Sequence, residues 1–409
     1  MLEHPGDEFL IGVDGGATEV KAHEIVSLSR DIAFRSGTSM LALGHGSASV
    51  LYDRARGFRP VAMPIQLLAL EKGTVRPSGL EGAQARLWLE ASARAIASVA
   101  EHAGRTRVRL GICMPGLKTA DGRGIAVMRR GPRIPDYLDR LERLLAEGGL
   151  ALERPVARLS SDGEACAHGE RIDAQGLLRG ISCAYYLGGG TGLAEALLIE
   201  GGIHGFDALS GFVRKAWQME ATGGRIVEDL LSPRGMNSAY AAASGKRLPL
   251  ARPDHPEQRA LMGDEKAAVV LRDAAEALAS VVLDRMTALR RGFQGGAGAG
   301  SSAANRSVRI TPNTFLERIV IGQRLGSLFA ADELRPIFRG PVEEVLARKI
   351  VATGDGALRK HYLEGSSLRP DLLVGSRLRA APAIGAVAME LEIAARTEEP
   401  PVEAPWDRP

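Results

Sequence analysis

The stretch Ile11-Gly-Val-Asp-Gly-Gly-Ala-Thr-Glu-Val-Lys21 decides the fold prediction. It begins as a short apolar strand, breaks at Asp14-Gly15-Gly16, and resumes as an extended run through Val26. A hydrophobic run, a glycine pair and a second run at this spacing predict a tight hairpin. The glycines can take positive φ and leave room for a phosphate or another backbone to approach. A purely structural Asp-Gly turn is the alternative for this stretch taken alone.

The turn also carries groups that suit a nucleotide. Asp14 would stand at its mouth, where a carboxylate can hold Mg²⁺ directly or through water. The Thr18 hydroxyl and the backbone N–H groups can donate to phosphate oxygens. We therefore expect a nucleotide site that includes Asp14, Gly15, Gly16, Thr18 and Lys21.

Composition bounds the class of protein. The chain has 409 residues, of which 45% are hydrophobic and 25% are charged, and this suits a globular enzyme of two or three lobes. A net charge of +3 is too small to indicate nucleic acid or membrane as a partner. Cys113, Cys166 and Cys183 form no CxxC pair, so neither a zinc cluster nor a disulfide framework is predicted. The sequence shows no secretory h-region and no apolar run of membrane-spanning length, so we expect a cytoplasmic protein.

The first half of the chain predicts a meander of three strands, followed by helices and further strands. Ala62–Leu70 is apolar and stays open between strand and helix, and Gly37–Arg59, rich in Gly and Ser, predicts a loop. The turn Met114-Pro115-Gly116 can present its backbone to a small ligand, although most Pro-Gly dipeptides are only turns. The predicted strands are Phe9–Asp14, Glu19–Val26, Asp31–Arg35, Val108–Cys113 and Val156–Leu159, and the predicted helices are Leu80–His102 and Asp136–Glu147.

Asp162 is the candidate for catalysis. It ends a Ser160-Ser161-Asp162 turn between a predicted strand and the small-residue helix Gly163–Glu170. Open α/β sheets bind ligands at such strand ends. A carboxylate there could take the proton of a substrate hydroxyl that attacks a phosphoryl group. The alternative is an N-cap, because Asp is a favoured capping residue.

A second glycine hairpin follows. Ile181–Leu187 is a predicted strand, Gly188–Gly192 a glycine turn with Thr191, and Ala196–Ile199 a returning strand. This repeats the order of the first hairpin, so we expect two similar lobes that each offer a turn to a shared polyphosphate. Its expected contacts are Gly189, Gly190, Thr191 and Gly192.

The rest of the chain is predicted to be mostly helical. A strand over Phe315–Ile321 leads into Gly322-Gln323 and a helix, a natural site for adenosine or phosphate. The Gly/Ala/Ser-rich stretch Gly295–Ser307 predicts a mobile surface insert, and the Pro/Glu-rich Thr397–Pro409 a disordered tail. The other predicted elements are a helix over Asp264–Arg291, a strand at Leu372–Val374 and a closing helix over Ala380–Ala395.

These motifs together resemble the ROK family (repressor, open reading frame, kinase) of actin-like sugar kinases, over roughly residues 9–395. Ser161-Asp162-Gly163-Glu164-Ala165 resembles the family's Asn-Asp-x-Asn-Ala segment. The other matching segments are Asp14–Thr18, Met114–Gly116, Gly190–Gly192, Ile319–Gly322 and Ala383–Ala386.

The resemblance implies an α/β fold of two actin-like (ribonuclease H-like) lobes with ATP and Mg²⁺ in the cleft. It implies phosphoryl transfer to a hydroxyl of a sugar-like acceptor with Asp162 as general base, and Gly322 and Gln323 at the nucleotide. The expected acceptor contacts are Pro115, Gly116, Ser161, Glu164, Glu195 and Arg214. The expected lobes are residues 1–158 and 159–380, with a closing helix at 381–396 that packs back on the first lobe. A homodimer is the one protein partner that we consider.

Four departures from the family pattern bear on the substrate. No cysteine follows Gly211, so the family's zinc cluster is not expected, and Ser161 and Gln323 replace a usual Asn and Gly. Leu209–Trp217 stands where the family has its sugar-reading Gly-Glu-x-Gly-His segment. We therefore expect an unusual acceptor, such as a modified sugar or a cyclitol. Arg214 and Lys215 in this segment suit an acidic or phosphorylated acceptor, or else form a solvated basic face.

Two further expectations concern the class of function. The first predicted strand begins at Phe9, so we expect no DNA-binding domain in front of it and disfavour the repressor branch. The competing hypothesis is an ATP-binding protein that senses or gates without phosphorylating a small molecule. The altered sugar segment favours that hypothesis, whereas Asp14, Asp162 and both glycine hairpins favour the kinase.

Overall fold

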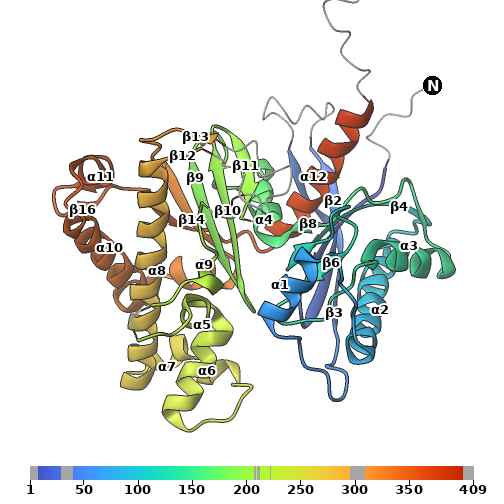
Figure 1. Cartoon of the computed structure of the whole chain (residues 1–409), viewed down its shortest axis with the longest axis horizontal. Helices are drawn as coiled ribbons and strands as arrows, with labels where there is room; N and C mark the ends of the chain where they lie inside the picture. The colour runs from blue at the N-terminus through green and yellow to red at the C-terminus, as the bar shows by residue number, and fades with distance from the viewer. Residues whose placement is uncertain are drawn as a thin grey trace, which may run out of the picture. The chain divides into compact units, whose positions relative to one another are not determined.

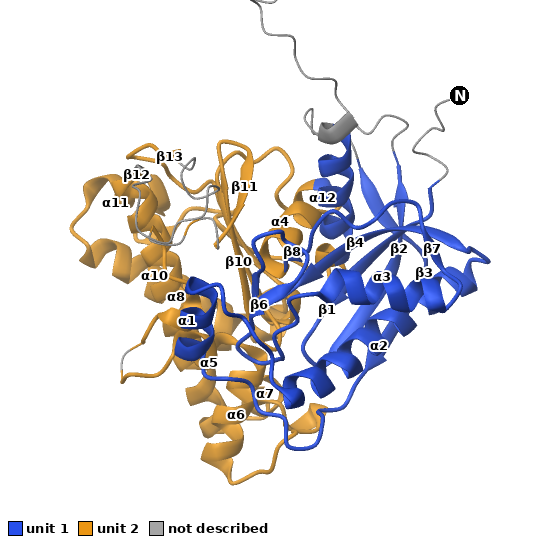
Figure 2. Cartoon of the chain, turned by 45° about the vertical axis from the view of Figure 1, so that its right-hand side comes forward, with its two compact units in different colours: residues 1–161, 172–174, 383–409 blue, residues 162–171, 175–382 orange. Residues whose placement is uncertain are grey.

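The computed structural model describes residues 8–28, 40–206, 209, 212–221, 223–294 and 309–398. The chain forms two compact units, coloured separately in Figure 2. Unit 1 comprises residues 1–161, 172–174 and 383–409, and unit 2 comprises residues 162–171 and 175–382. The expected strand Asp31–Arg35, the insert 295–307 and positions 399–409 of the expected tail lie outside the described residues.

Unit 1 is built on a mixed sheet in the order β3-β2-β1-β4-β7, with β8 also paired to β4. The central strand β1 is antiparallel to β2 and parallel to β4. The predictions of strands at 9–14, 19–26 and 108–113 are confirmed. The strands are β1 (Leu10–Gly15), β2 (Glu19–Ser27), β3 (Leu41–Leu51), β4 (Arg107–Met114), β7 (Ala151–Leu152) and β8 (Ser160–Ser161), with a separate β5 (Leu117–Lys118) and β6 (Ile125–Val127) pair.

The loop expected over Gly37–Arg59 is wrong for residues 41–51, because β3 is an eleven-residue strand along the edge of this sheet. Residues 52–59 form neither helix nor strand, as expected, and residues 37–39 lie outside the described part of the chain. Its small residues accommodate a carboxylate. The Glu24 Oε2 atom on β2 accepts hydrogen bonds from the N–H groups of His45 (2.9 Å) and Gly46 (2.8 Å). A Cβ at Gly44 would overlap the same carboxyl group. The glycines that suggested a loop are therefore the residues that let the strand lie against Glu24.

Helices cover both faces of the sheet in unit 1. Ile11 and Val13 point into a core formed with α2 (Gly79–His102) and α3 (Tyr137–Glu147). The alternate residue Gly12 points the other way. A Cβ there would overlap the Ala383 carbonyl of α12 (Ala381–Glu398), so this glycine lets the last helix reach the sheet. The expectation of a disordered tail is wrong at Thr397 and Glu398, which belong to α12.

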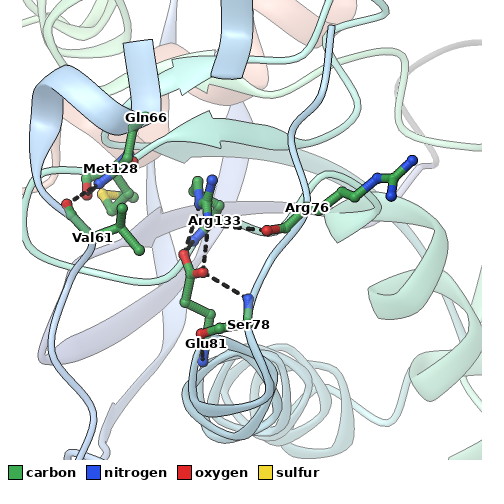
Figure 3. A network of polar contacts seen from close by, with 7 residues as sticks. All are labelled: Val61, Gln66, Arg76, Ser78, Glu81, Met128 and Arg133. Carbon is green, nitrogen blue, oxygen red and sulfur yellow. Dashed lines mark hydrogen bonds and ion pairs between the residues drawn. The ribbon is translucent and has the colours of Figure 1, made fainter. Parts of the chain in front are cut away.

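The ambiguous segment Ala62–Leu70 is a helix, α1 (Met63–Glu71). Its one buried residue is Gln66, whose amide bonds the Val61 carbonyl and both backbone groups of Met128 (Figure 3). In the same region Glu81 and Arg133 form a buried two-point ion pair with a shortest N–O distance of 2.7 Å. Burial opposes ionisation of Glu81, but its hydrogen bonds from Arg133 and Ser78 outweigh this and lower the pKa of the carboxyl.

The expected strand Val156–Leu159 is also wrong. Only Ser160–Ser161 forms ladder bonds, as β8 beside β4. The N–H groups of Val156 and Ala157 bond the side chains of Glu142 (3.1 Å) and Glu390 (3.2 Å) instead of a neighbouring strand. Val156 and Leu159 are buried, so their apolar character reflects packing without strand pairing.

Unit 2 has a five-stranded sheet in the order β11-β10-β9-β14-β17, with helices on both faces (Figure 1). Tyr185 and Leu197 point to the face covered by α8 (Glu265–Arg291). Tyr186 and Ala196 point to the opposite face, which α4 (Asp162–Ile172) covers through Cys166 and Ala167. The strands are β9 (Ala184–Gly189), β10 (Leu193–Ile199), β11 (Gly202–Gly205), β14 (Arg318–Gly322) and β17 (Leu373–Gly375).

The remaining elements of unit 2 surround this sheet. The α-helices are α5 (Val227–Leu231), α6 (Pro233–Ser244), α7 (Pro256–Leu261), α9 (Gln323–Phe329), α10 (Gly340–Ala352) and α11 (Gly356–Tyr362). The short strands are β12 (Phe293–Gln294), β13 (Arg309–Ile310), β15 (Leu363–Glu364) and β16 (Ser367–Leu368). Three 3₁₀ turns cover Ala216–Gln218, Arg252–Asp254 and Asp332–Leu334, and a π-helical turn covers Arg335–Arg339. None of the helices in the described part of the chain combines the length and apolar character that a bilayer crossing needs.

Candidate functional site

In unit 1, the first glycine hairpin forms as expected between β1 and β2. Asp14 lies near the end of β1, opposite Lys21 on β2 and beside Cys113 on β4. The Lys21 ammonium is 3.3 Å from the Glu19 carboxylate, so it already has an acidic neighbour. Thr18 is exposed in the turn. The hairpin therefore presents Thr18 at its tip with Asp14 and Lys21 as a cross-strand pair behind it.

The glycines of this hairpin are required for a reason other than the expected one. Neither Gly15 nor Gly16 takes positive φ. A Cβ at Gly15 would overlap the Met114 thioether, and one at Gly16 would lie 2.7 Å from the Glu19 carbonyl oxygen. Protein atoms therefore occupy the space where a side chain would stand at both glycines, and the backbone of Glu19 makes the close approach at Gly16. The expected phosphate contacts of Gly15 and Gly16 stay predictions.

The residues of unit 1 that were predicted to contact the acceptor lie at the end of β4. Met114 pairs with Ser161 of β8 and is followed by Pro115 and Gly116. Gly116 has a φ of 88°, and a Cβ there would overlap the Val127 carbonyl oxygen. This turn therefore needs glycine both for its conformation and for its close packing.

Sequence reasoning missed Lys118 at this turn. Its ammonium donates to the carbonyl oxygens of Met114 (2.7 Å) and Gly116 (2.8 Å). It therefore places a positive charge at the end of β4, where Ser161 also lies. The available signal was its position two residues after the Pro-Gly turn, within reach of the turn's carbonyl groups.

In unit 2, Asp162 is the first residue of α4 and directly follows β8. Its Oδ1 atom accepts a hydrogen bond from the Gly163 N–H at 2.9 Å. A Cβ at Gly163 would overlap the backbone of Glu195 on β10, so the start of α4 is packed against that strand. Glu164 stands in the first turn of the same helix. The strand-to-helix junction expected for Asp162 is confirmed; its role as a base stays a prediction.

The second glycine hairpin joins β9 to β10 in unit 2. A Cβ at Gly189 would lie 2.7 Å from the Leu325 Cβ, and one at Gly192 would lie 3.4 Å from the Glu228 carboxylate. A Cβ at Gly190 would meet nothing within 4 Å. Thr191 lies between these last two glycines. Gly190 is therefore the turn glycine that borders open space.

The turn predicted for adenosine lies next to this hairpin. Gly189 forms a parallel bridge with Gln323, which follows Gly322 at the end of β14. Gln323 has a φ of 58°, a left-handed conformation that costs a side-chain-bearing residue about 1–3 kcal/mol. A Cβ at Gly322 would overlap the hydroxyl of the buried Tyr186. Gln323, which stands where the ROK family usually has glycine, therefore has a backbone conformation that glycine would adopt without strain.

Glu195 has partners that the acceptor prediction did not include. Its Oε1 atom accepts from the Tyr185 hydroxyl (2.7 Å) and the Arg285 guanidinium (2.8 Å), and its Oε2 atom accepts from the Ala216 N–H (2.8 Å). Both carboxylate oxygens are thus engaged by the protein itself. Glu195 is only 8% exposed. This geometry argues that Glu195 supports the segment Leu209–Trp217, through its bond from the Ala216 N–H, instead of contacting the substrate directly.

Arg285 was not singled out from the sequence. It is fully buried in α8, and it also donates to the Asp284 carboxylate (2.6 Å) and the Arg214 carbonyl (2.7 Å). Burial disfavours its charged form, but the Glu195 carboxylate outweighs this and the pKa of Arg285 is raised. The sequence does offer a signal for a buried ion pair here, since this arginine lies within the Ala/Leu/Val-rich part of a long helix.

Metal ligands do not cluster within the described ranges. No group of three or more His, Cys, Asp or Glu residues there is arranged to hold a metal ion, and all three cysteines are buried and in no disulfide. A single carboxylate with water ligands can still hold Mg²⁺ beside phosphates. Asp14 as a Mg²⁺ contact and the lack of a zinc site both stay predictions.

Comparisons with known proteins identify the fold. No family model matches the sequence, and no curated protein matches it. The structure is similar to a ROK family glucokinase from Streptomyces griseus in complex with glucose and AMPPNP, with a TM-score of 0.52 at 16% identity over 94% of this chain and 99% of that chain. It is similar to a ROK hexokinase from Thermus thermophilus, with a TM-score of 0.51 at 18% identity over 94% and 99%. A ROK family transcriptional regulator, a homologue of the E. coli MLC protein, gives a TM-score of 0.50 at 11% identity over 95% and 79%.

The chain therefore has the α/β fold of the ROK sugar kinases, made of two actin-like units, as the sequence motifs predicted. The same fold occurs in a transcriptional regulator, so the fold by itself does not separate an enzyme from a regulator. Activity has to be argued from the residues of the site.

Proposed function

We propose that this protein is an ATP-dependent kinase that phosphorylates a hydroxyl of a sugar or a sugar-like molecule such as a cyclitol or modified sugar. The observation that carries the proposal is the position of Asp162. It directly follows Ser161, which pairs with Met114 immediately before the Pro115-Gly116 turn. Open α/β sheets bind ligands at such junctions of strand and helix, and a carboxylate there would serve as the base for a small acceptor.

The nucleotide would use groups from both glycine hairpins. Gly190 borders open space that the phosphates would occupy, while its own N–H donates to the Gly192 carbonyl at 2.9 Å. The Thr191 hydroxyl would donate to the phosphate oxygens. Thr18 would act in the same way in the first hairpin, with Asp14 holding Mg²⁺ directly or through water. Gln323 would stand at the adenosine end, next to Gly189.

The acceptor would be bound by the turn at Pro115 and Gly116, by Ser161 and by Glu164. Asp162 would accept the proton of the acceptor hydroxyl as its oxygen bonds the γ-phosphorus of ATP and ADP leaves. A Mg²⁺ ion at Asp14 would supply positive charge beside the phosphates.

The test is Asp162→Asn. Asn keeps the size of the side chain and an Oδ1 acceptor for the Gly163 N–H, but it cannot take the proton. General base catalysis contributes about 10²–10⁴ in rate, so kcat should fall by about that factor. Thermal stability and ATP affinity should change little, because Asn is nearly as good a helix cap as Asp.

A cap without a catalytic role predicts the opposite pattern. Asp162→Asn would then be as active as wild type, and Asp162→Ala would lose about 1 kcal/mol of stability with activity largely intact. A folded Asp162→Asn protein with a near wild-type rate would therefore remove the proposed mechanism.

The second candidate is an ATP-binding protein that gates or senses without phosphorylating a small molecule. The similarity of the fold to a ROK transcriptional regulator and the altered segment at Leu209–Trp217 favour it. ADP release measured with and without a panel of sugars and cyclitols separates the two. Stimulation by any polyol supports the kinase, and slow turnover that no acceptor changes supports the gate.

A further inference from the structure

Unit 2 contains a cavity of about 250 Å³ that is lined by residues outside the proposed phosphoryl-transfer site. Four of them, Asp284, Thr287, Ala288 and Arg291, lie on the last turns of α8, and Gly292 follows directly. Phe212 and Arg214 come from the segment after β11. The cavity is therefore formed where this segment meets the C-terminal end of α8.

Two guanidinium groups of this cavity are available for an anion. Arg214 and Arg291 are exposed, and in the described part of the chain neither side chain has a hydrogen bond or an ion pair. A guanidinium offers a planar pair of N–H donors that matches a carboxylate or phosphate. The cavity also contains the Asp284 carboxylate, but that group is already paired with Arg285 at 2.6 Å.

The remaining walls suit the hydroxyl groups and the carbon face of a polyol. The Thr287 hydroxyl donates to the Leu283 carbonyl (2.8 Å), so its oxygen can accept from a ligand hydroxyl. The Phe212 ring packs on Phe293 with centroids 4.9 Å apart, which fixes one apolar wall. The buried Arg285 side chain donates a hydrogen bond to the Arg214 carbonyl, and this bond holds the Arg214 backbone in place.

The sheet separates this cavity from the proposed base. The cavity is on the α8 side, the side to which Tyr185 and Glu195 point, whereas Asp162 begins α4 on the opposite face (Figure 1). Glu195 lies between the two. Its backbone packs on Gly163 next to Asp162, and its side chain holds the Ala216 N–H and Arg285.

We propose that this cavity is a second binding site, separate from the phosphoryl-transfer site, for a small hydroxylated molecule that carries a phosphate or a carboxylate. Arg214 and Arg291 bind the anionic group, and Thr287 and Asp284 bind hydroxyls. The inference does not depend on the proposed function, because it concerns binding in the absence of ATP. It gives Arg214 a role different from the acceptor contact predicted from the sequence, and the experiment decides between the two.

The test is calorimetry on the full-length protein without nucleotide, using glucose 6-phosphate, gluconate, inorganic phosphate and glucose as probes. Glucose 6-phosphate, gluconate or both should bind more tightly than phosphate alone, and glucose should bind least. The Arg214→Ala, Arg291→Ala double variant should weaken binding about tenfold or more, because each charge-assisted pair is lost. Binding to wild type should also weaken with added salt, because the arginines are exposed.

Arg272→Ala is the matched control, since Arg272 is an exposed arginine on the same helix and does not line the cavity. It should bind the probes like wild type. The proposal is wrong if none of the probes binds wild type at low salt, or if the double variant binds as tightly as the control. It is also wrong if the bound probe is itself phosphorylated and the double variant raises its KM, because the cavity would then be part of the acceptor site.

Discussion

The two glycine hairpins have the same order of strand, turn and strand, but their glycines have different functions. In the first hairpin, protein atoms occupy the space beside Gly15 and Gly16. In the second, Gly190 borders open space while its neighbour Gly189 packs on Leu325. The difference teaches that glycines in turns of similar sequence can be required by packing in one place and border open space in another.

The supports of the two hairpins also differ. The Tyr52 hydroxyl donates to the Gly16 carbonyl at 2.9 Å, and the Tyr52 ring stacks on Trp88. In the second hairpin the Glu228 carboxylate accepts from the Leu193 N–H at 3.4 Å, a longer contact. The first turn is therefore held by a hydroxyl anchored in the core, and the second by a carboxylate from α5. Three substitutions test this comparison.

The largest expected effect is on nucleotide binding at Gly190. ATP with Mg²⁺ at 100 times its Kd should stabilise the wild-type protein by about 2.7 kcal/mol. Gly190→Val should remove most of that protection by filling the space that phosphates need. The unliganded protein should keep its thermal midpoint, because nothing lies within 4 Å of a Cβ at this position. Thermal unfolding with and without ATP–Mg²⁺ measures both.

Gly190→Ala is the graded control and should lose less protection than Gly190→Val. If the folded Val variant gains as much stability from ATP as wild type does, the second hairpin does not contact the phosphates.

The next effect is on folding at Gly15. Gly15→Ala should lower the free energy of unfolding by about 1–3 kcal/mol, because the new methyl group overlaps the buried Met114 thioether. Met114→Ala should restore part of the loss in the double variant, since the two sites share one space. Denaturant unfolding gives all three values.

A Gly15→Ala protein as stable as wild type would show that Met114 can move aside. The distinction between the two hairpins would then rest on Gly16 alone, where the obstacle is the backbone carbonyl of Glu19.

The smallest effect is expected at Tyr52. Tyr52→Phe removes the hydrogen bond to the Gly16 carbonyl and should cost about 0.5–1.5 kcal/mol. Burial raises the pKa of the Tyr52 phenol, so the hydroxyl stays protonated and its contribution is present below the unfolded pKa of about 10. The difference between the two proteins should therefore be constant from pH 6 to about pH 9 and should fall only as pH rises further toward the folded pKa.

A difference that disappears between pH 6 and about pH 9 would contradict the assigned donor. Unfolding measured at several pH values, with both proteins in the same buffers, supplies the comparison.

The sequence by itself determined the features that depend on neighbouring residues. The strand–glycine–strand order at both hairpins, the helix over Leu80–His102 and the junction at Asp162 all follow from local periodicity and turn chemistry, and the structure contains them. Local composition also misled. The glycines within residues 41–51 predicted a loop, but they accommodate the Glu24 side chain. Glu24 belongs to another strand, so the local sequence could not show this reason for the glycines.

Only the tertiary structure decided which groups meet. Glu195 and Arg285 are 90 residues apart in the chain and form a buried ion pair that no local pattern marks. The space beside Gly15 is filled by Met114 of β4, and the space beside Gly190 stays open, although the two turns are alike in sequence. A residue's own neighbours set its backbone preference, whereas free space and hydrogen-bond partners are set by atoms that the fold brings from elsewhere in the chain.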